Sequence, residues 1–253
     1  MTKDQWASFC SFKEDFKKQC AVWEQKAEIL GLSVLQSKAA LNDGVPLYPL
    51  ENPIVYNTAL DAVCDQDSIK LIVIADNPGK DEQLHKNRKY LVGLSGKIAA
   101  GFFKKHPELD IDFRKNVIIL NKTPVHTAKT KELKALAASD PLIQSLIDES
   151  QMWMAQRTAE LHIQLGCPLW LVGYAELKGK GIFSLYRDTL KNTYTSSFPV
   201  SGEKENCFNK VFVFQHFSMN RFTIDLFHHA DAGQKLQELL EQKGTQHRKE
   251  IFL

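Results

Sequence analysis

The sequence lacks the long apolar stretches of membrane-spanning and exported proteins. No apolar run approaches the roughly 18 residues that indicate a membrane span. The first residues, Met-Thr-Lys-Asp-Gln-Trp, are mostly charged or polar and lack the apolar stretch of a signal peptide. We therefore expect a cytoplasmic protein with no membrane partner.

Cysteine is sparse and irregularly placed. The chain has five cysteines, at positions 10, 20, 64, 167 and 207, and none of them forms a Cys-x-x-Cys pair. A disulfide framework uses an even number of cysteines, and zinc or iron-sulfur sites use closely spaced ligands. The sequence therefore predicts neither disulfides, nor a metal, nor an iron-sulfur cluster.

The net charge is too small to indicate nucleic acid by itself. The chain carries 32 Lys and Arg against 30 Asp and Glu, a formal net charge of +2. The cations nevertheless gather after the first predicted strand and around the second, at Lys80, Lys86, Arg88, Lys89, Lys97, Lys104, Lys105, Arg114, Lys115, Lys122, Lys129, Lys131 and Lys134. Such clustering would attract a phosphate backbone, although solvated helix faces explain each single lysine equally well.

Four short apolar runs indicate the fold of the 253-residue chain. They are Leu71-Ile-Val-Ile-Ala75, Val117-Ile-Ile-Leu120, Leu169-Trp-Leu-Val172 and Val211-Phe-Val-Phe214. Apolar runs without polar alternation are typical of strands buried on both faces. They predict an α/β fold, a three-layer α/β/α sandwich with a central, mainly parallel sheet. The order of the strands is not readable from the sequence.

Helices are predicted around these strands, within a single domain of residues 1–253. An N-terminal helical segment, residues 1–45, carries aromatic residues at helical spacing between about residues 4 and 30. Another helix begins at Asp140-Pro141 and ends before Gly166. Residues 231–253 are expected to form a C-terminal helix to about Lys243 and a frayed tail.

Polar residues follow three of the four runs directly and are candidates for a site. Asp76-Asn77-Pro78-Gly79 follows the first run, Asn121 the second and Gln215-His216-Phe217-Ser218 the fourth. Ligands of open α/β sheets bind outside the carboxyl ends of the strands, so these residues are expected to converge in one crevice. Asn-Pro-Gly is also an ordinary turn sequence. The stretch Gly93-Leu-Ser-Gly-Lys97 is not a P-loop, because it lacks the first glycine and the final hydroxyl residue.

Five short motifs occur in the order of the uracil-DNA glycosylase superfamily. They are Asn52-Pro-Ile-Val-Tyr56, Ala75-Asp-Asn-Pro-Gly79, Tyr90-Leu-Val-Gly-Leu-Ser-Gly-Lys97, Asn121-Lys-Thr-Pro124 and His216-Phe-Ser-Met-Asn-Arg221. The first, second and fourth resemble the single-strand-selective monofunctional uracil glycosylases, whose turn reads Gly-Met-Asn-Pro-Gly. The third is similar to the iron-sulfur uracil glycosylases, which carry Pro-Phe-Val-Gly-x-x-Gly-Lys. The resemblance spans about residues 52–221.

The resemblance implies three catalytic residues. Asn77 matches the asparagine that places or polarises the attacking water, and Asp76 matches the glutamate of the iron-sulfur branch. His216 matches the histidine that stabilises negative charge on the departing base. We expect all three to line one pocket at the carboxyl edge of the sheet.

The resemblance also implies substrate-binding residues, which we expect in the same pocket. Tyr90 stands where the family has the aromatic ring that stacks on the extruded base, and Asn121 matches the asparagine that reads the edge of the base. Pro78, Gly79 and Ser218 belong to the same motifs and are expected to contact the substrate.

The chain departs from the family pattern at several positions. Phe217 replaces the proline of the family's His-Pro-Ser turn, Ala75 stands where glycine is usual, and Tyr90 replaces a phenylalanine. The cysteines of the iron-sulfur branch are absent. These departures bear on activity more than on the fold.

Three hypotheses of function follow. In the first, the chain is a monofunctional DNA glycosylase that hydrolyses the N-glycosidic bond of uracil or a related deaminated base, with water as nucleophile and neither metal nor cofactor. In the second, it binds DNA, a nucleotide or a base without catalysis. In the third, it is a different hydrolase or transferase that uses the same crevice for another small substrate. The preferred base, the strandedness of the DNA and the oligomeric state stay open.

Overall fold

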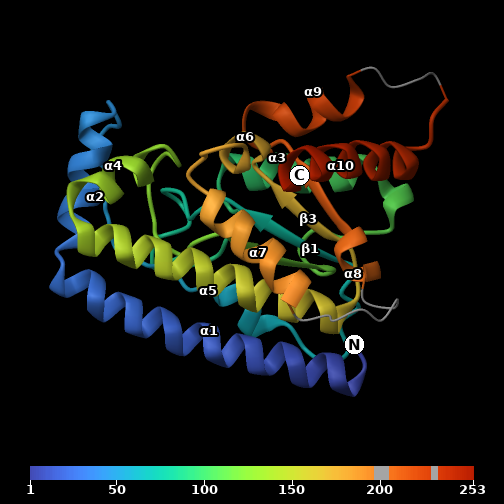
Figure 1. Cartoon of the computed structure of the whole chain (residues 1–253), viewed down its shortest axis with the longest axis horizontal. Helices are drawn as coiled ribbons and strands as arrows, with labels where there is room; N and C mark the ends of the chain where they lie inside the picture. The colour runs from blue at the N-terminus through green and yellow to red at the C-terminus, as the bar shows by residue number, and fades with distance from the viewer. Residues whose placement is uncertain (197–204, 229–232) are drawn as a thin grey trace.

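The centre of the molecule is a four-stranded parallel sheet (Figure 1). The computed structural model describes residues 1–196, 205–228 and 233–253. The strands are β1 (Leu71–Ala75), β2 (Val117–Asn121), β3 (Leu169–Val172) and β4 (Val211–Phe214). Their order is β2-β1-β3-β4, and each neighbouring pair is parallel. All four predicted strands are confirmed, and the structure supplies the order that the sequence did not.

Helices surround this sheet. The longer ones are α1 (Lys3–Ile29), α2 (Leu32–Asn42), α3 (Leu94–Lys105), α4 (Glu132–Ser139), α5 (Pro141–Leu165), α7 (Ser184–Ser196) and α10 (Leu236–Phe252). The shorter ones are α6 (Tyr174–Leu177), α8 (Glu205–Asn209), α9 (Arg221–Phe227), and the 3₁₀ turns η1 (Thr58–Ala62), η2 (Pro107–Leu109) and η3 (Ser218–Asn220). None of the helices in the described ranges is both long and apolar enough to cross a lipid bilayer.

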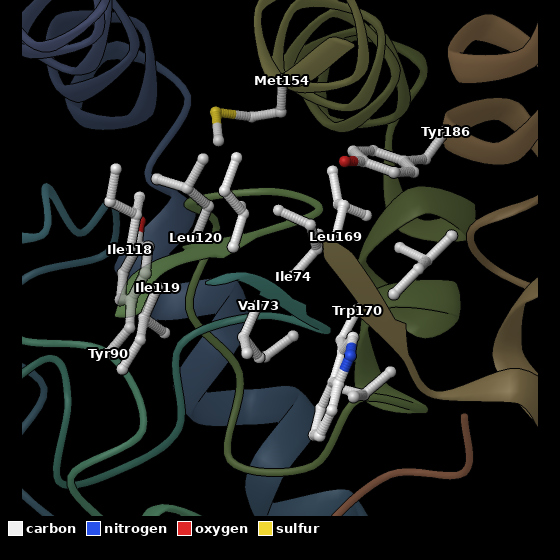
Figure 2. Close-up of a cluster of buried hydrophobic side chains, with 14 of the residues drawn as sticks. Val73, Ile74, Tyr90, Ile118, Ile119, Leu120, Met154, Leu169, Trp170 and Tyr186 are labelled. Carbon is white, nitrogen blue, oxygen red and sulfur yellow. The ribbon is translucent and has the colours of Figure 1, made fainter. Parts of the chain in front are cut away.

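The two faces of the sheet are covered by different helices, so the predicted three-layer α/β/α sandwich is confirmed. On one face, Met154 of α5 and Tyr186 of α7 lie over Ile74 and Leu169 (Figure 2). On the other face, the ring of Trp170 stacks on rings of α3 and α9, at 5.4 Å from Phe103 and 5.6 Å from Phe222. Burial on both sides explains why the strands contain no polar alternation.

The helix α1 packs along α5 through its aromatic residues. Phe12, Phe16 and Trp23 contact the ring of Trp153 on α5, with ring centroids 6.4, 5.7 and 5.6 Å away. Thr2 caps the helix, because its side chain accepts a hydrogen bond from the backbone N–H of Gln5. The aromatic spacing in the sequence therefore reports packing, and its prediction of a helix here is confirmed.

The C-terminal helix covers the edge strand β4. His247 donates from its ring to the carbonyl of Val213, and Arg248 donates to the carbonyl of Val211. These carbonyls face away from β3, so α10 satisfies a sheet edge that would otherwise be open. The predicted end near Lys243 is wrong: α10 continues to Phe252 because Ile251 and Phe252 are buried. Residues 231 and 232 of the predicted segment lie outside the described residues.

Candidate functional site

A pocket of about 610 Å³ opens at the carboxyl edge of the sheet. Asp76 and Asn77 reach it from the end of β1, Gly173 from the end of β3, and Gln215 and His216 from the end of β4. Its other lining residues are Ala75, Gly79, Glu82, Leu91, Ser95, Thr127, Ala128, Lys129, Thr130, Ala175, Glu176, Ser218, Met219 and Arg221. The parallel topology thus brings together three strand ends that are far apart in sequence.

Asp76 is held at the pocket by a buried lysine. The Nζ of Lys122 lies 2.5 Å from Oδ1 of Asp76 and 2.5 Å from the carbonyl oxygen of Val172. Lys122 has no exposed surface, and its Nζ also lies 4.9 Å from the ring centroid of Phe183. Loss of water lowers the pKa of Lys122, and the charge of Asp76 opposes that change. The second oxygen of Asp76 accepts no hydrogen bond from any residue that the structure describes.

The local backbone explains why Lys122 points beneath Asp76. The N–H of Lys122 donates to the carbonyls of both Ala75 and Asp76, which continues the β1–β2 pairing past the strand ends. Gly173 leaves room for the pair, since a Cβ atom there would lie 2.3 Å from Oδ1 of Asp76 and 3.1 Å from Nζ of Lys122. Its φ of +95° also favours glycine.

The turn at residues 76–79 is fastened to the segment at residues 122–127. Nδ2 of Asn77 donates to Oγ1 of Thr127 at 2.8 Å and to the carbonyl of Val125 at 3.3 Å. The ring Nδ1 of His126 donates to the carbonyl of Pro78 at 2.8 Å. Asn77 therefore uses its nitrogen internally, and its Oδ1 has no protein donor within the described part of the chain. Both Asp76 and Asn77 thus keep one acceptor oxygen unused by the protein.

His126 is a neutral structural histidine. Burial lowers its pKa to about 4, because the charged ring would lose its hydration. With Nδ1–H donated to Pro78, its Nε2 accepts the hydroxyl of Tyr48 at 2.9 Å. This arrangement fixes the tautomer and, through it, the carbonyl of Pro78. Pro78 contributes to the site through that carbonyl and does not line the pocket, whereas Gly79 and Ser218 do.

His216 presents a donor to the pocket. Its Nδ1 accepts the backbone N–H of Ser218 at 3.1 Å and lies 2.9 Å from Oγ of Ser218. The neutral ring therefore carries its proton on Nε2, which has no partner among the described residues. Burial lowers the pKa of His216, and the charge of Asp76 acts in the opposite direction. Neutral His216 is thus an N–H donor without a positive charge.

Phe217, the departure from the family's proline, anchors the loop that carries His216. Its side chain is fully buried, and its ring lies 4.8 Å from that of Phe222 and 6.5 Å from that of Phe113. The next residue but one, Met219, has a φ of 53° and is 69 % exposed at the rim of the pocket. The apolar anchor takes the place of proline's rigidity in holding the loop.

Tyr90 and Asn121 do not line the pocket, so their predicted placement is wrong. The ring of Tyr90 lies in the core beside Ile119 (Figure 2), and its hydroxyl donates to the carbonyl of Val55 at 2.5 Å. Leu91, which has a φ of 52°, lines the pocket instead. Asn121 is buried at the end of β2, and its Nδ2 has no hydrogen-bond acceptor in the described residues. The sequence could not reveal how the chain turns after Tyr90.

Glu82 is a pocket residue that the sequence analysis missed. One of its oxygens accepts the N–H of Leu91 at 3.0 Å, and the other accepts the N–H of Gly79 at 3.4 Å. Burial raises the pKa of Glu82 to about 7, although these two N–H groups and Arg114 favour the charged form. Glu82 thus links two walls of the pocket, which a single acidic residue after a turn does not reveal in the sequence.

Lys122 was also misplaced by the sequence analysis, which grouped it with cations available to phosphate. Its complete burial excludes that role. The only signal was its position inside the motif Asn121-Lys-Thr-Pro124. Within the described residues, no group of three or more His, Cys, Asp or Glu side chains could hold a metal ion.

Comparison of the chain with models of protein families, with characterised proteins and with solved structures finds no match.

Proposed function

We propose that the chain is a monofunctional glycosylase that hydrolyses the N-glycosidic bond of uracil, or of a related deaminated base, in DNA. One observation carries this proposal. Two unused acceptor oxygens, on Asp76 and Asn77, and one N–H donor, on His216, meet in a single pocket from the ends of β1 and β4. Acceptors on one side and a donor on the other are what hydrolysis of a glycosidic bond requires.

The acceptors would position the water. Oδ1 of Asn77 and the free oxygen of Asp76 would each accept a hydrogen bond from it, which directs its lone pair towards C1′ of the deoxyribose. As the C1′–O bond forms, the bond between C1′ and the base nitrogen breaks, and its electron pair leaves with the base. The proton lost by the water passes to Asp76 and then to the base, so the products are a sugar hydroxyl and a neutral base. This is general-base help from a carboxylate.

The donor would stabilise the departing base. Negative charge develops on the pyrimidine as the bond breaks, and Nε2–H of His216 would donate to the oxygen that carries it. One such donor is typically worth about 2.7 to 4 kcal/mol in the transition state. A neutral histidine suits this task, because its lowered pKa keeps a proton on Nε2 without charging the ring.

DNA as the substrate is supported by the rim of the pocket. Lys129 and Arg221 place positive charge there, and Met219 adds an exposed apolar side chain beside them. A base must leave the helix to enter such a pocket, at a cost of a few kcal/mol. Phosphate contacts by the cations and apolar contact with exposed bases would offset that cost.

A second candidate function has its own supporting observation. Tyr90 and Asn121, the expected stacking and base-reading residues, lie outside the pocket lining. That favours a protein that holds DNA, a nucleotide or a base in the pocket without catalysis.

The two candidates are separated by comparing binding with base release on the same oligonucleotide. We expect the wild-type protein to release free uracil from a single-stranded oligonucleotide with one uracil, and its DNA affinity to fall steeply as salt rises. Binding of that oligonucleotide without any release would favour the non-catalytic candidate. Binding of free uracil with no affinity for DNA would contradict both DNA-directed candidates.

A further inference from the structure

We propose that Lys122 is the positioning residue of the site, which ties one oxygen of Asp76 and thereby aims the other at the attacking water. The proposal rests on the glycosylase function proposed above and assigns a task to a side chain that never meets the substrate. Lys122 is fully enclosed and does not line the pocket, so it acts only through Asp76.

The contacts of Lys122 define one orientation of the carboxylate. Its Nζ is held between Oδ1 of Asp76 and the carbonyl of Val172, both at 2.5 Å, and the ring of Phe183 lies 4.9 Å away. These groups come from the ends of β1 and β3 and from the start of the α7 region. An ammonium fixed from three directions leaves the carboxylate little freedom to rotate.

The pair is asymmetric in a way that a purely structural ion pair does not require. Asp76 offers one oxygen to Lys122, while its other oxygen has no donor among residues 1–196, 205–228 and 233–253. Buried ion pairs are weak stabilisers, and apolar residues of similar volume often serve stability as well or better. A buried lysine under a pocket carboxylate is better explained by the carboxylate it holds. Removing water also strengthens the field of this fixed charge at the pocket.

Gly173 provides an independent way to disturb the same carboxylate. A Cβ atom at this position would lie 2.3 Å from Oδ1 of Asp76, so Gly173→Ala must displace the carboxylate while every charge stays in place. Gly166 is a matched control: it also has a positive φ, of +66°, but a Cβ there meets nothing within 4 Å. The backbone strain is therefore similar in the two variants, and only one moves Asp76.

The experiment is single-turnover release of uracil from an oligonucleotide, analysed for its maximal rate and its half-saturating protein concentration. Lys122→Met and Gly173→Ala should each lower the maximal rate by at least about thirtyfold and change half-saturation by less than about threefold, because binding does not use the displaced oxygen. Lys122→Arg, which keeps the charge, should recover part of the rate. Lys26→Met breaks a half-exposed pair with Glu149 on the α1–α5 contact and should leave the rate unchanged, as should Gly166→Ala.

The outcomes separate this proposal from the function on which it rests. If the wild-type protein releases no uracil, the glycosylase function fails and the task of Lys122 falls with it. If the wild type is active but folded Lys122→Met or Gly173→Ala keeps the wild-type maximal rate, the positioning role is overturned and the function stands. An effect confined to half-saturation would likewise overturn it. Should Lys122→Met not fold, Gly173→Ala decides the question.

Discussion

At the scale of single residues, the pair formed by Asp76 and Lys122 dominates the electrostatics of the pocket. Both side chains are almost fully buried, and their charged atoms lie 2.5 Å apart. Removing two charges from water is costly, and their attraction offsets that cost only while both remain. The pair is therefore sensitive to the loss of either partner and tolerant of the loss of both.

Lys122→Met should lower the free energy of unfolding at pH 7 by about 3 to 5 kcal/mol, since it leaves a buried carboxylate without its counter-charge. The double variant Lys122→Met/Asp76→Asn buries no charge and should lose clearly less. Urea denaturation followed by tryptophan fluorescence measures both. Lys26→Met, in the more exposed pair with Glu149, should lose no more than about 1 kcal/mol. Equal losses in the single and double variants would show that the charges of the pair are not coupled.

At the scale of elements, the pocket walls are joined by side chains that cross from one connection to another. Glu82 links the turn after β1 to the residues before α3, by accepting the N–H groups of Gly79 and Leu91. Arg114, which precedes β2, donates to the carbonyls of Tyr90 and Leu91. The placement of Leu91 at the pocket therefore depends on a buried carboxyl group whose charge is unfavourable.

Glu82 makes stability fall as pH rises. The pKa of Glu82 is about 7 in the folded protein against an ordinary value of 4.5, so its contribution is fully present below pH 4.5 and is lost as pH rises to about 7. The difference of 2.5 pKa units, at about 1.36 kcal/mol each, corresponds to roughly 3 kcal/mol. Glu82→Gln removes this ionisation. Relative to wild type, the variant should gain most of that amount between pH 4.5 and pH 8, as urea denaturation would measure.

Glu28→Gln, at an exposed position on α1, is the control and should follow the wild-type pH dependence. If Glu82→Gln also runs parallel to wild type across this pH range, Glu82 does not ionise at an unfavourable cost in the folded state.

Elements whose signals are local were predictable from the sequence. The four strands are unbroken apolar runs, and α5 begins at the Asp140 cap and ends at Gly166, as the sequence indicates. The extension of α10 to Phe252 was not predictable, because its last turns are polar in sequence apart from two residues that bury against the core. Its role as cover of an edge strand depends on the strand order, which no local signal contains.

At the scale of the whole molecule, the parallel sheet is what converts a distant set of residues into a site. The sequence predicted that Asp76, Asn77 and His216 would meet, because they follow buried strands, and the structure brings all three to one pocket. Tyr90 lies between strands, in a connection whose path no periodicity specifies, and it turned into the core. Lys122 alternates with Asn121 to the opposite face of the sheet, where its partner comes from another strand. Side chains at strand ends were thus predictable, and partners across strands were not.

The most direct measurement is single-turnover release of uracil from a single-stranded oligonucleotide by the wild-type protein and by His216→Ala. If the pocket hydrolyses the glycosidic bond with His216 as donor to the departing base, the wild type releases uracil and the variant is slower by about a hundredfold or more. His85→Ala, which changes an exposed histidine outside the pocket, should keep the wild-type rate. A wild-type protein that binds the oligonucleotide but releases no base, or a His216→Ala variant that releases it at the wild-type rate, would contradict this function for the pocket.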